Sequence, residues 1–229
     1  MYVPSSNAEQ RPEVMFDFIE AHPLGILVTG SDEGLFATHL PLLLDRSRGP
    51  HGTLQGHIAR ANRQHAIAAA EMEALVIFSG PDAYISPSFY PSKAEHGKVV
   101  PTWNYVAVHA YGRVRYTSDV QHLRAHVGRL TGHHEASRAE PWSVEDAPVD
   151  YVDQQLRAIV GVEIDITRLE GKWKMSQNRS AADIDGVVAG LGASEEARER
   201  MVADLVQSRR ADASREPKTT PRTTEPPHG

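Results

Sequence analysis

The stretch GPDAYISPSFYPSKAEHGKVVPTWNY, from Gly80 to Tyr105, combines prolines, aromatic side chains and lysines. Each proline fixes its own φ and restricts the residue before it, so the backbone path is stiff. The aromatic rings offer flat apolar surfaces with polar edges, and Lys93 and Lys98 could meet phosphate or carboxylate groups. The stretch therefore predicts a cradle for a planar, anionic ligand. The alternative is a rigid connection whose rings close one end of a barrel.

Apolar runs on both sides of this stretch predict strands, which decide the fold class. The predicted strands cover residues 24–30, 35–45, 53–58, 74–80, 103–116 and 160–171. Apolar spacing and capping residues predict helices at residues 12–21, 59–70, 118–130, 151–159 and 194–210. Strands dominate the first half and helices are scattered around them. We therefore predict an α+β fold, a β-barrel with peripheral helices.

Length and composition indicate one domain with a tail. The chain has 229 residues, of which 40% are hydrophobic, enough for a proper core. We predict that residues 1–210 form the domain. Residues 211–229 are rich in threonine, proline and charge, and we predict that they form a disordered tail.

Charge and cysteine content exclude several functional classes. The chain has no cysteine, which rules out disulfides, thiolate metal sites and cysteine nucleophiles. Its formal net charge of −6 opposes non-specific binding to DNA or anionic lipid, so we expect no direct nucleic-acid contact. No membrane-length apolar run and no secretory signal are visible, so we expect a cytoplasmic protein without a membrane partner.

Several long motifs occur in an order that is typical of one family. Besides residues 80–105, they are MYVP (1–4), HPLGILVT (22–29), THLPLLLD (38–45), GHIARAN (56–62), PWSVEDAP (141–148) and RLEGKWKMSQNR (168–179). Over roughly residues 1–190 the chain resembles the PaiB-type, FMN-binding split-barrel proteins. The resemblance implies a split β-barrel, a homodimer and ligand sites at the dimer interface.

His65 is the most informative single residue. In the predicted helix 59–70 it shares a face with the small residues Ala61, Ala68 and Ala69, which leave room for a flat macrocycle. The family motif usually has a tryptophan at this place, so the histidine is a departure. A neutral imidazole is a common axial ligand of haem iron. The alternative is a histidine that packs as a smaller ring and hydrogen-bonds a carbonyl.

The chain is most similar to the haem-dependent piperazate synthase branch of this family. That resemblance implies haem b held by His65, and an enzyme that forms an N–N bond by cyclising N5-hydroxy-L-ornithine to L-piperazic acid. The alternative is an FMN-binding PaiB-type negative regulator of transcription. A third reading is a small flavin or F420 oxidoreductase of the wider split-barrel group.

Other side chains are weaker candidates. As cofactor-binding residues beside His65 we predict Arg60, Ala61, Ala69, Lys93, Lys98 and Trp103. As catalytic residues we predict His39, Tyr90 and Lys93, with His57 and His109 as alternatives to His39. Lys93 is the best anionic-ligand partner, because it lies inside PSFYPSK among aromatic rings.

His122 and His126 are spaced as i and i+4 on the predicted helix 118–130, and this spacing can hold a metal ion. The apolar stripe of the helix lies elsewhere, and no carboxylate at a fitting offset completes the set. We therefore expect both imidazoles to face solvent without a metal.

Overall fold

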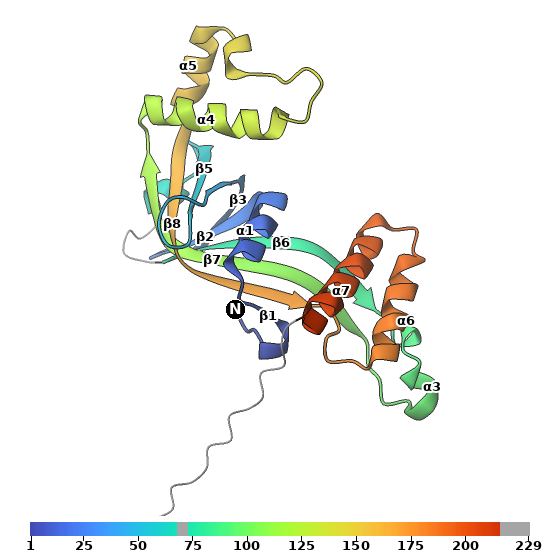
Figure 1. Cartoon of the computed structure of the whole chain (residues 1–229). Coiled ribbons are helices and arrows are strands. Elements are labelled where there is room, and N and C mark those ends of the chain that lie inside the picture. The colour runs from blue at the N-terminus through green and yellow to red at the C-terminus, as the bar shows by residue number, and fades with distance from the viewer. Residues whose placement is uncertain (68–72, 216–229) are drawn as a thin grey trace, which may run out of the picture. The chain divides into compact units, whose positions relative to one another are not determined.

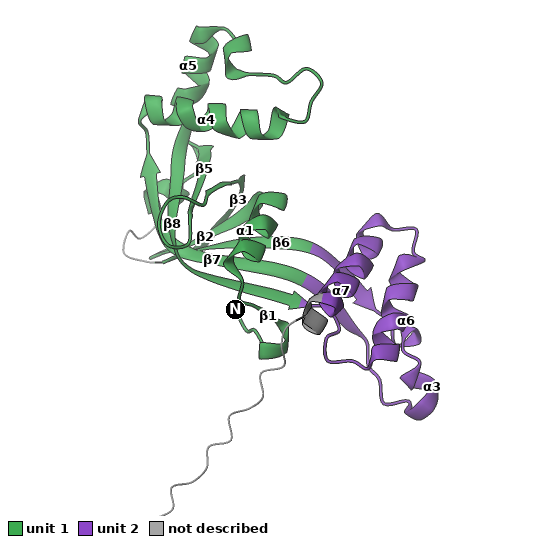
Figure 2. Cartoon of the chain, viewed as in Figure 1, with its two compact units in different colours: residues 1–80, 106–173 green, residues 81–105, 174–229 purple. Residues whose placement is uncertain are grey.

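The computed structural model describes residues 1–67 and 73–215, which divide into two compact units (Figure 2). Unit 1 comprises the described residues of 1–80 and 106–173, and unit 2 comprises those of 81–105 and 174–229. The prediction of one domain over residues 1–210 stays a prediction beside this division. Three long strands begin in one unit and end in the other: β6 (Ala74–Ile85), β7 (Thr102–Thr117) and β8 (Ile159–Lys174).

The remaining elements (Figure 1) each belong to one of the two units coloured in Figure 2. Unit 1 holds η1 (Ser5–Asn7), β1 (Ala8–Glu9), α1 (Pro12–Ala21), β2 (Leu24–Ser31), β3 (Gly34–Pro41), β4 (Leu43–Asp45), β5 (Thr53–Ala59), α2 (Gln64–Ile67), α4 (Val120–Glu135), η3 (Val144–Asp146) and α5 (Val149–Arg157). Unit 2 holds η2 (Pro87–Phe89), α3 (Ser92–His96), α6 (Ala181–Gly192) and α7 (Ala197–Arg215).

The strands form one sheet in the order β3-β2-β6-β7-β8-β5-β4, with β1 paired to β8. Strand β2 pairs antiparallel with β3 and β6, and β5 pairs antiparallel with β4 and β8. Leu27 lies opposite Thr38 between β2 and β3, and Ala59 lies opposite Ile159 between β5 and β8. The two ends of the sheet approach each other, since β3 contacts β5. A side chain at Gly56 in β5 would lie 3.0 Å from the Leu40 side chain, so glycine permits this approach. The predicted α+β class, an antiparallel sheet with peripheral helices, is confirmed.

The core of unit 1 follows the two periodicities seen in the sequence. Inward side chains of the strands, such as Leu27, Val76 and Ile164, have no exposed surface. Helix α1 contributes an apolar stripe that includes Phe18 and Ile19, as its spacing predicts. Burying one such side chain contributes about 1.5–3 kcal/mol, so this packing holds α1 on the strands.

Helices α4 and α5 pack on each other in unit 1. Asp119 caps α4 by accepting a hydrogen bond from the His122 backbone nitrogen at 2.6 Å. Leu123 of α4 lies in a small apolar cluster with Val144, Val152 and Leu156. The two helices therefore have an apolar cluster of their own.

In unit 2 the segment after β6 packs on α6. Asp183 in the first turn of α6 accepts hydrogen bonds from the Ser92 backbone nitrogen at 3.1 Å and hydroxyl at 2.9 Å. A Cβ atom at Gly186 would lie 1.9 Å from the Phe89 carbonyl oxygen, and one at Gly190 would lie 2.4 Å from the Phe89 ring. Glycine at both positions lets the backbone of η2 and the Phe89 ring lie directly on α6.

The C-terminal end of the described chain differs from the prediction. Helix α7 continues through Ala211 to Arg215, because the intervening residues include helix-favouring alanine and arginine. The predicted tail boundary at residue 211 therefore falls inside a helix. The rest of the predicted tail, residues 216–229, lies outside the described residues. Of the helices described, none has the length and apolarity needed to cross a membrane.

Candidate functional site

His65 lies in the short helix α2 and its side chain is half-buried. Its Nδ1 atom is 2.7 Å from the backbone carbonyl oxygen of Asn62. A carbonyl oxygen only accepts hydrogen bonds, so Nδ1 must carry the proton. The Nε2 atom then bears the lone pair, which is the form of imidazole that ligates a metal.

The predicted helix 59–70 is wrong in its first part. Strand β5 runs to Ala59, and the Arg60 backbone nitrogen donates to the Ala158 carbonyl at 2.7 Å, which keeps the chain beside the start of β8. Ala61 then lies in an exposed turn rather than on the helical face expected for it, and α2 begins only at Gln64. Ala69, another predicted cofactor-binding residue, lies outside the described residues.

Asn62 and Gln64 hold this turn on the hairpin of β2 and β3. The Asn62 amide nitrogen donates to the Thr38 hydroxyl at 2.8 Å, and its side-chain oxygen accepts from the Gln64 backbone nitrogen at 2.9 Å. The Gln64 side chain is completely buried and donates to acceptors on both strands. Sequence reasoning missed both residues. An asparagine two residues before a glutamine indicates only a turn and does not reveal partners more than twenty residues away.

Tyr116 of β7 lies next to His65, with the two rings edge to face and their centroids 6.2 Å apart. The Tyr116 hydroxyl is buried and has no hydrogen-bond partner among the residues that the structure describes. Burial raises the pKa of Tyr116 to about 12. The hydroxyl therefore stays neutral and can donate a hydrogen bond to a ligand beside His65.

Arg60 and His39 have environments that differ from the roles predicted for them. The Arg60 guanidinium donates to the carbonyls of Arg157 at 2.7 Å and Ile159 at 2.9 Å, so it is used to hold the chain rather than left free for a ligand. His39 in β3 is exposed, whereas its neighbour Thr38 contacts Asn62. Successive strand side chains point to opposite faces, so His39 points away from the Asn62 side. Its distal role stays a prediction.

Tyr90 and Phe89 do not line an open cradle, contrary to the expectation for residues 80–105. Tyr90 is 2% exposed, and the Arg179 guanidinium lies 4.7 Å from its ring centre. Burial raises the pKa of the Tyr90 hydroxyl, which has no hydrogen-bond partner in the described part of the chain. With Phe89 on α6, these two rings have a structural role, although they pack within unit 2 rather than close one end of a barrel as the alternative reading expected.

The exposed part of the same stretch is smaller. Trp103 is 49% exposed and Tyr84 is 46% exposed, and their rings meet edge to face at 5.9 Å. Lys93 and Lys98 are exposed in α3 and just after it. The structure thus places the predicted residues in two groups. His39, Arg60 and His65 belong to unit 1, and Tyr90, Lys93, Lys98 and Trp103 belong to unit 2.

His126 is buried, and the expectation that both helix histidines face solvent is wrong for it. It is 1% exposed, and its Nε2 lies 3.2 Å from Nδ1 of His57 in β5. Burial, then the nearby charges of His57 and Arg129, lowers the pKa of His126 to about 4. Within residues 1–67 and 73–215, no group of three or more His, Asp or Glu side chains is arranged to hold a metal ion.

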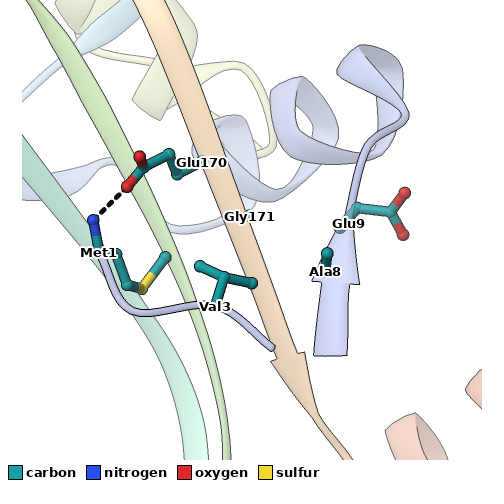
Figure 3. A pocket seen from close by; sticks show the side chains of 6 residues that line it. All are labelled: Met1, Val3, Ala8, Glu9, Glu170 and Gly171. Atoms are coloured by element: carbon teal, nitrogen blue, oxygen red, sulfur yellow. Dashed lines mark hydrogen bonds and ion pairs between the residues drawn. The ribbon is translucent and has the colours of Figure 1, made fainter. Parts of the chain in front are cut away.

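A pocket of about 270 Å³ lies between β1, β8 and the first residues of the chain (Figure 3). Its lining residues are Met1, Val3, Ala8, Glu9, Glu170 and Gly171, none of which is a predicted site residue. Glu9 is paired with Arg11 at 2.7 Å, and Glu170 is paired with the Met1 nitrogen. Its charged groups are two carboxylates and the Met1 amino group, all of which already have partners, so the pocket does not suit an anionic cofactor.

The comparisons with known proteins identify relatives along most of the chain. A family model described as "Putative FMN-binding domain" matches residues 1–168. An uncharacterised protein of Emericella nidulans is 37% identical over 226 residues, covering 83% of this chain and 90% of that protein. The "Protease synthase and sporulation protein PAI 2" of Bacillus subtilis is 30% identical over 209 residues, covering 91% of this chain and 98% of that protein.

One similar solved structure is the FAD and haem binding protein of Mycobacterium smegmatis. It superposes with a TM-score of 0.54 at 16% identity, and the match covers 80% of each chain. At this identity the likeness shows the fold alone. It agrees with the antiparallel sheet and peripheral helices, so the predicted split-barrel class is confirmed.

Proposed function

This chain belongs to the FMN-binding domain family, and from that premise and the geometry of His65 we propose that it binds haem b through His65. The observation that carries the proposal is the Nδ1 contact with the Asn62 carbonyl, which leaves the lone pair on Nε2. Iron-ligating histidines commonly donate their other ring N–H to a carbonyl, which fixes the tautomer and raises the basicity of the ligand.

The surroundings of His65 fit a haem ligand on one side. The imidazole is half-buried, and the small side chain of Ala61 lies in the turn before it. The buried Tyr116 hydroxyl without a described partner supplies a hydrogen-bond donor beside the imidazole. For the propionates we propose Lys93 and Lys98, both exposed, rather than Arg60, whose guanidinium is already bonded.

We propose that the protein cyclises N5-hydroxy-L-ornithine to L-piperazic acid. The N5–O bond breaks, a bond between the α-nitrogen and N5 forms, and the hydroxyl leaves with an amine proton as water. The atoms balance without an outside oxidant. The chemistry that haem supplies when bound is Lewis acidity toward the hydroxylamine, which weakens its N–O bond.

The protein must hold the α-amine neutral and close to N5. We propose that His39 accepts the amine proton and that Lys93 binds the substrate carboxylate or a haem propionate. Tyr90 is the weakest of the three predicted catalytic residues, because its ring is packed inside unit 2.

We further propose that the protein acts as a homodimer. Leu24 is 62% exposed and Leu35 is 82% exposed on the β2–β3 hairpin, which also carries Thr38. The two side chains lie toward opposite ends of the hairpin, Leu24 opposite Pro41 and Leu35 opposite Gly30, and exposed apolar surface of this kind favours an interface. A partner copy on this hairpin would lie near the Asn62–His65 turn and could close the site.

A flavin-binding regulator of gene expression is the second candidate. It is favoured by the description of the family as FMN-binding and by the name of the Bacillus subtilis relative, a protease synthase and sporulation protein. The fold of the Mycobacterium smegmatis protein, which binds both FAD and haem, is compatible with either cofactor.

One absorption spectrum tests the cofactor proposal. The protein is purified from cells supplied with a haem precursor and with riboflavin, and its spectrum is recorded. A Soret band in stoichiometric amount supports haem, and turnover of N5-hydroxy-L-ornithine to a product lighter by one water supports the cyclase. A flavin spectrum without a Soret band would overturn the proposal in favour of the second candidate.

A further inference from the structure

We propose that Gln64 and Asn62 are positioning residues, which together hold His65 as an iron ligand; this inference rests on the proposed haem function. Neither residue is expected to touch the cofactor. They act by fixing the turn that presents the imidazole. The chain of contacts runs from strands β2 and β3, through the two amide side chains, to Nδ1 of His65.

Gln64 fixes the start of α2 to the hairpin. Its Nε2 atom lies 3.1 Å from the Leu27 carbonyl, 3.1 Å from the Thr29 hydroxyl and 3.3 Å from the Phe36 carbonyl. These acceptors lie on both strands of the hairpin. A single buried amide therefore holds the residue directly before His65 against two strands.

Asn62 fixes the atom that His65 contacts. Its side chain is held at both ends, by Thr38 at 2.8 Å and by the Gln64 backbone nitrogen at 2.9 Å. These two contacts fix the conformation of Asn62, and they therefore also orient its backbone carbonyl, which accepts the hydrogen bond from His65. The orientation of the imidazole thus depends on the same hydrogen bonds as the orientation of the turn.

The described part of α2 cannot supply this order by itself. It comprises only residues 64–67, and a single helical turn is unfavourable without outside contacts. The Gln64 side chain also carries an unusual cost. Its Oε1 atom is buried and has no partner among the described residues, which disfavours folding. A residue that only fills the core would be better apolar. A buried amide that is hydrogen-bonded at one end only is therefore better explained by a role in holding the turn in place.

The central test compares Gln64→Leu with Gln55→Leu in the full-length holoprotein. Gln55 is a matched control, because it is also a buried glutamine of unit 1, with contacts to Glu163 at 2.8 Å and Arg129 at 3.1 Å. We expect Gln64→Leu to speed haem transfer to apomyoglobin by 10- to 100-fold, the range typical for loss of groups that orient a metal ligand. Gln55→Leu should leave the transfer rate unchanged even if both variants lose similar thermal stability. Equal transfer rates for the wild type and Gln64→Leu would overturn the inference.

A second background separates positioning from general weakening. In His65→Gly, added free imidazole replaces the histidine side chain as the ligand. Gln64 and Asn62 then have no side chain left to position. Adding Gln64→Leu to this background should then have no further effect on haem retention. The same 10- to 100-fold loss in both backgrounds would mean that Gln64 only stabilises the fold, and would overturn the inference.

Histidine ¹⁵N NMR of the haem-free protein distinguishes failure of this inference from failure of the proposed function. We expect His65 to show the Nδ1–H tautomer in the wild type and in Gln55→Leu, and a mixture of tautomers in Gln64→Leu. A fixed tautomer in all three proteins overturns the positioning role of Gln64 and Asn62 and leaves the haem proposal intact. If the wild type shows the expected tautomer but takes up no haem, the haem proposal is overturned. The role of Gln64 and Asn62 in positioning an iron ligand is then overturned with it.

Discussion

The turn around His65 and the aromatic stretch of residues 80–105 are both predicted from the sequence to serve the ligand, but the structure treats them differently. The aromatic stretch has the stronger ligand-binding pattern, yet Phe89 and Tyr90 pack within unit 2. The turn before His65 resembles an ordinary helix start, yet it is held by buried hydrogen bonds and fixes the imidazole with its lone pair on Nε2. Aromatic residues gather at binding sites and in cores alike, so composition alone does not separate the two. The fixed tautomer of His65 does.

The largest expected effect concerns the buried polar contacts of unit 1. The pKa of His126 is lowered to about 4 in the folded protein, against 6.5 for the free side chain. The unfolded state therefore binds the proton more tightly, and stability that is complete above pH 6.5 is lost as the pH falls toward 4. By linkage the loss amounts to roughly 3 kcal/mol.

Urea unfolding between pH 7.5 and 4 measures this effect. The groups facing His126 include His57, Arg129, His122 and Glu163, of which only Glu163 opposes the shift. In His126→Gln the slope of stability against pH should flatten across this range. A slope equal to that of the wild type would show that His126 is not the group that titrates.

A slightly smaller effect is expected from packing in unit 2. In Gly186→Ala the new methyl group would meet the Phe89 carbonyl oxygen, and the backbone would have to move. Such overpacking costs about 1–3 kcal/mol. Gly192→Ala is the matched control in the same helix, because nothing lies within 4 Å of its added Cβ. Thermal unfolding should separate the two variants, and equal melting temperatures would contradict the packing of η2 on α6.

The next effect tests whether the exposed part of the aromatic stretch still serves the ligand. Lys93 is exposed in α3, and loss of a charge-assisted hydrogen bond to a propionate or carboxylate costs about 1.5–3 kcal/mol. Lys93→Ala should therefore lower haem occupancy or substrate affinity by roughly tenfold or more while the melting temperature is unchanged. Haem content and the substrate binding constant distinguish the two roles. If neither changes, Lys93 is a solvated surface residue.

The smallest effect is expected at Tyr90. Its hydroxyl is buried and has no partner in the described chain, so Tyr90→Phe removes no hydrogen bond seen there. Stability should change by less than about 0.5 kcal/mol or rise slightly. Turnover should also be preserved if the ring serves only packing. A large loss of turnover at unchanged stability would restore the catalytic role predicted from the sequence.

The sequence predicts the strands and α1 well, because their apolar periodicity is strong and local. It fails where a distant partner decides the outcome. The pairing of Ala59 with Ile159 extends β5 and shortens the predicted helix. His126 is buried because it lies between Leu123 and Leu130 on the inward face of α4, and His57 gives its imidazole a partner. The contacts of Gln64 reach residues that no local pattern connects to it.

The haem content of His65→Ala tests the central claim most directly. The wild type, His65→Ala and His122→Ala are purified from haem-supplied cells, and haem per chain is measured by the pyridine haemochrome method. His122 is the control because it is another histidine of unit 1, on α4 rather than α2. We predict stoichiometric haem in the wild type and in His122→Ala, and almost none in a folded His65→Ala. The variant His65→Gly should regain haem when free imidazole is added. Full haem content in His65→Ala would contradict the account.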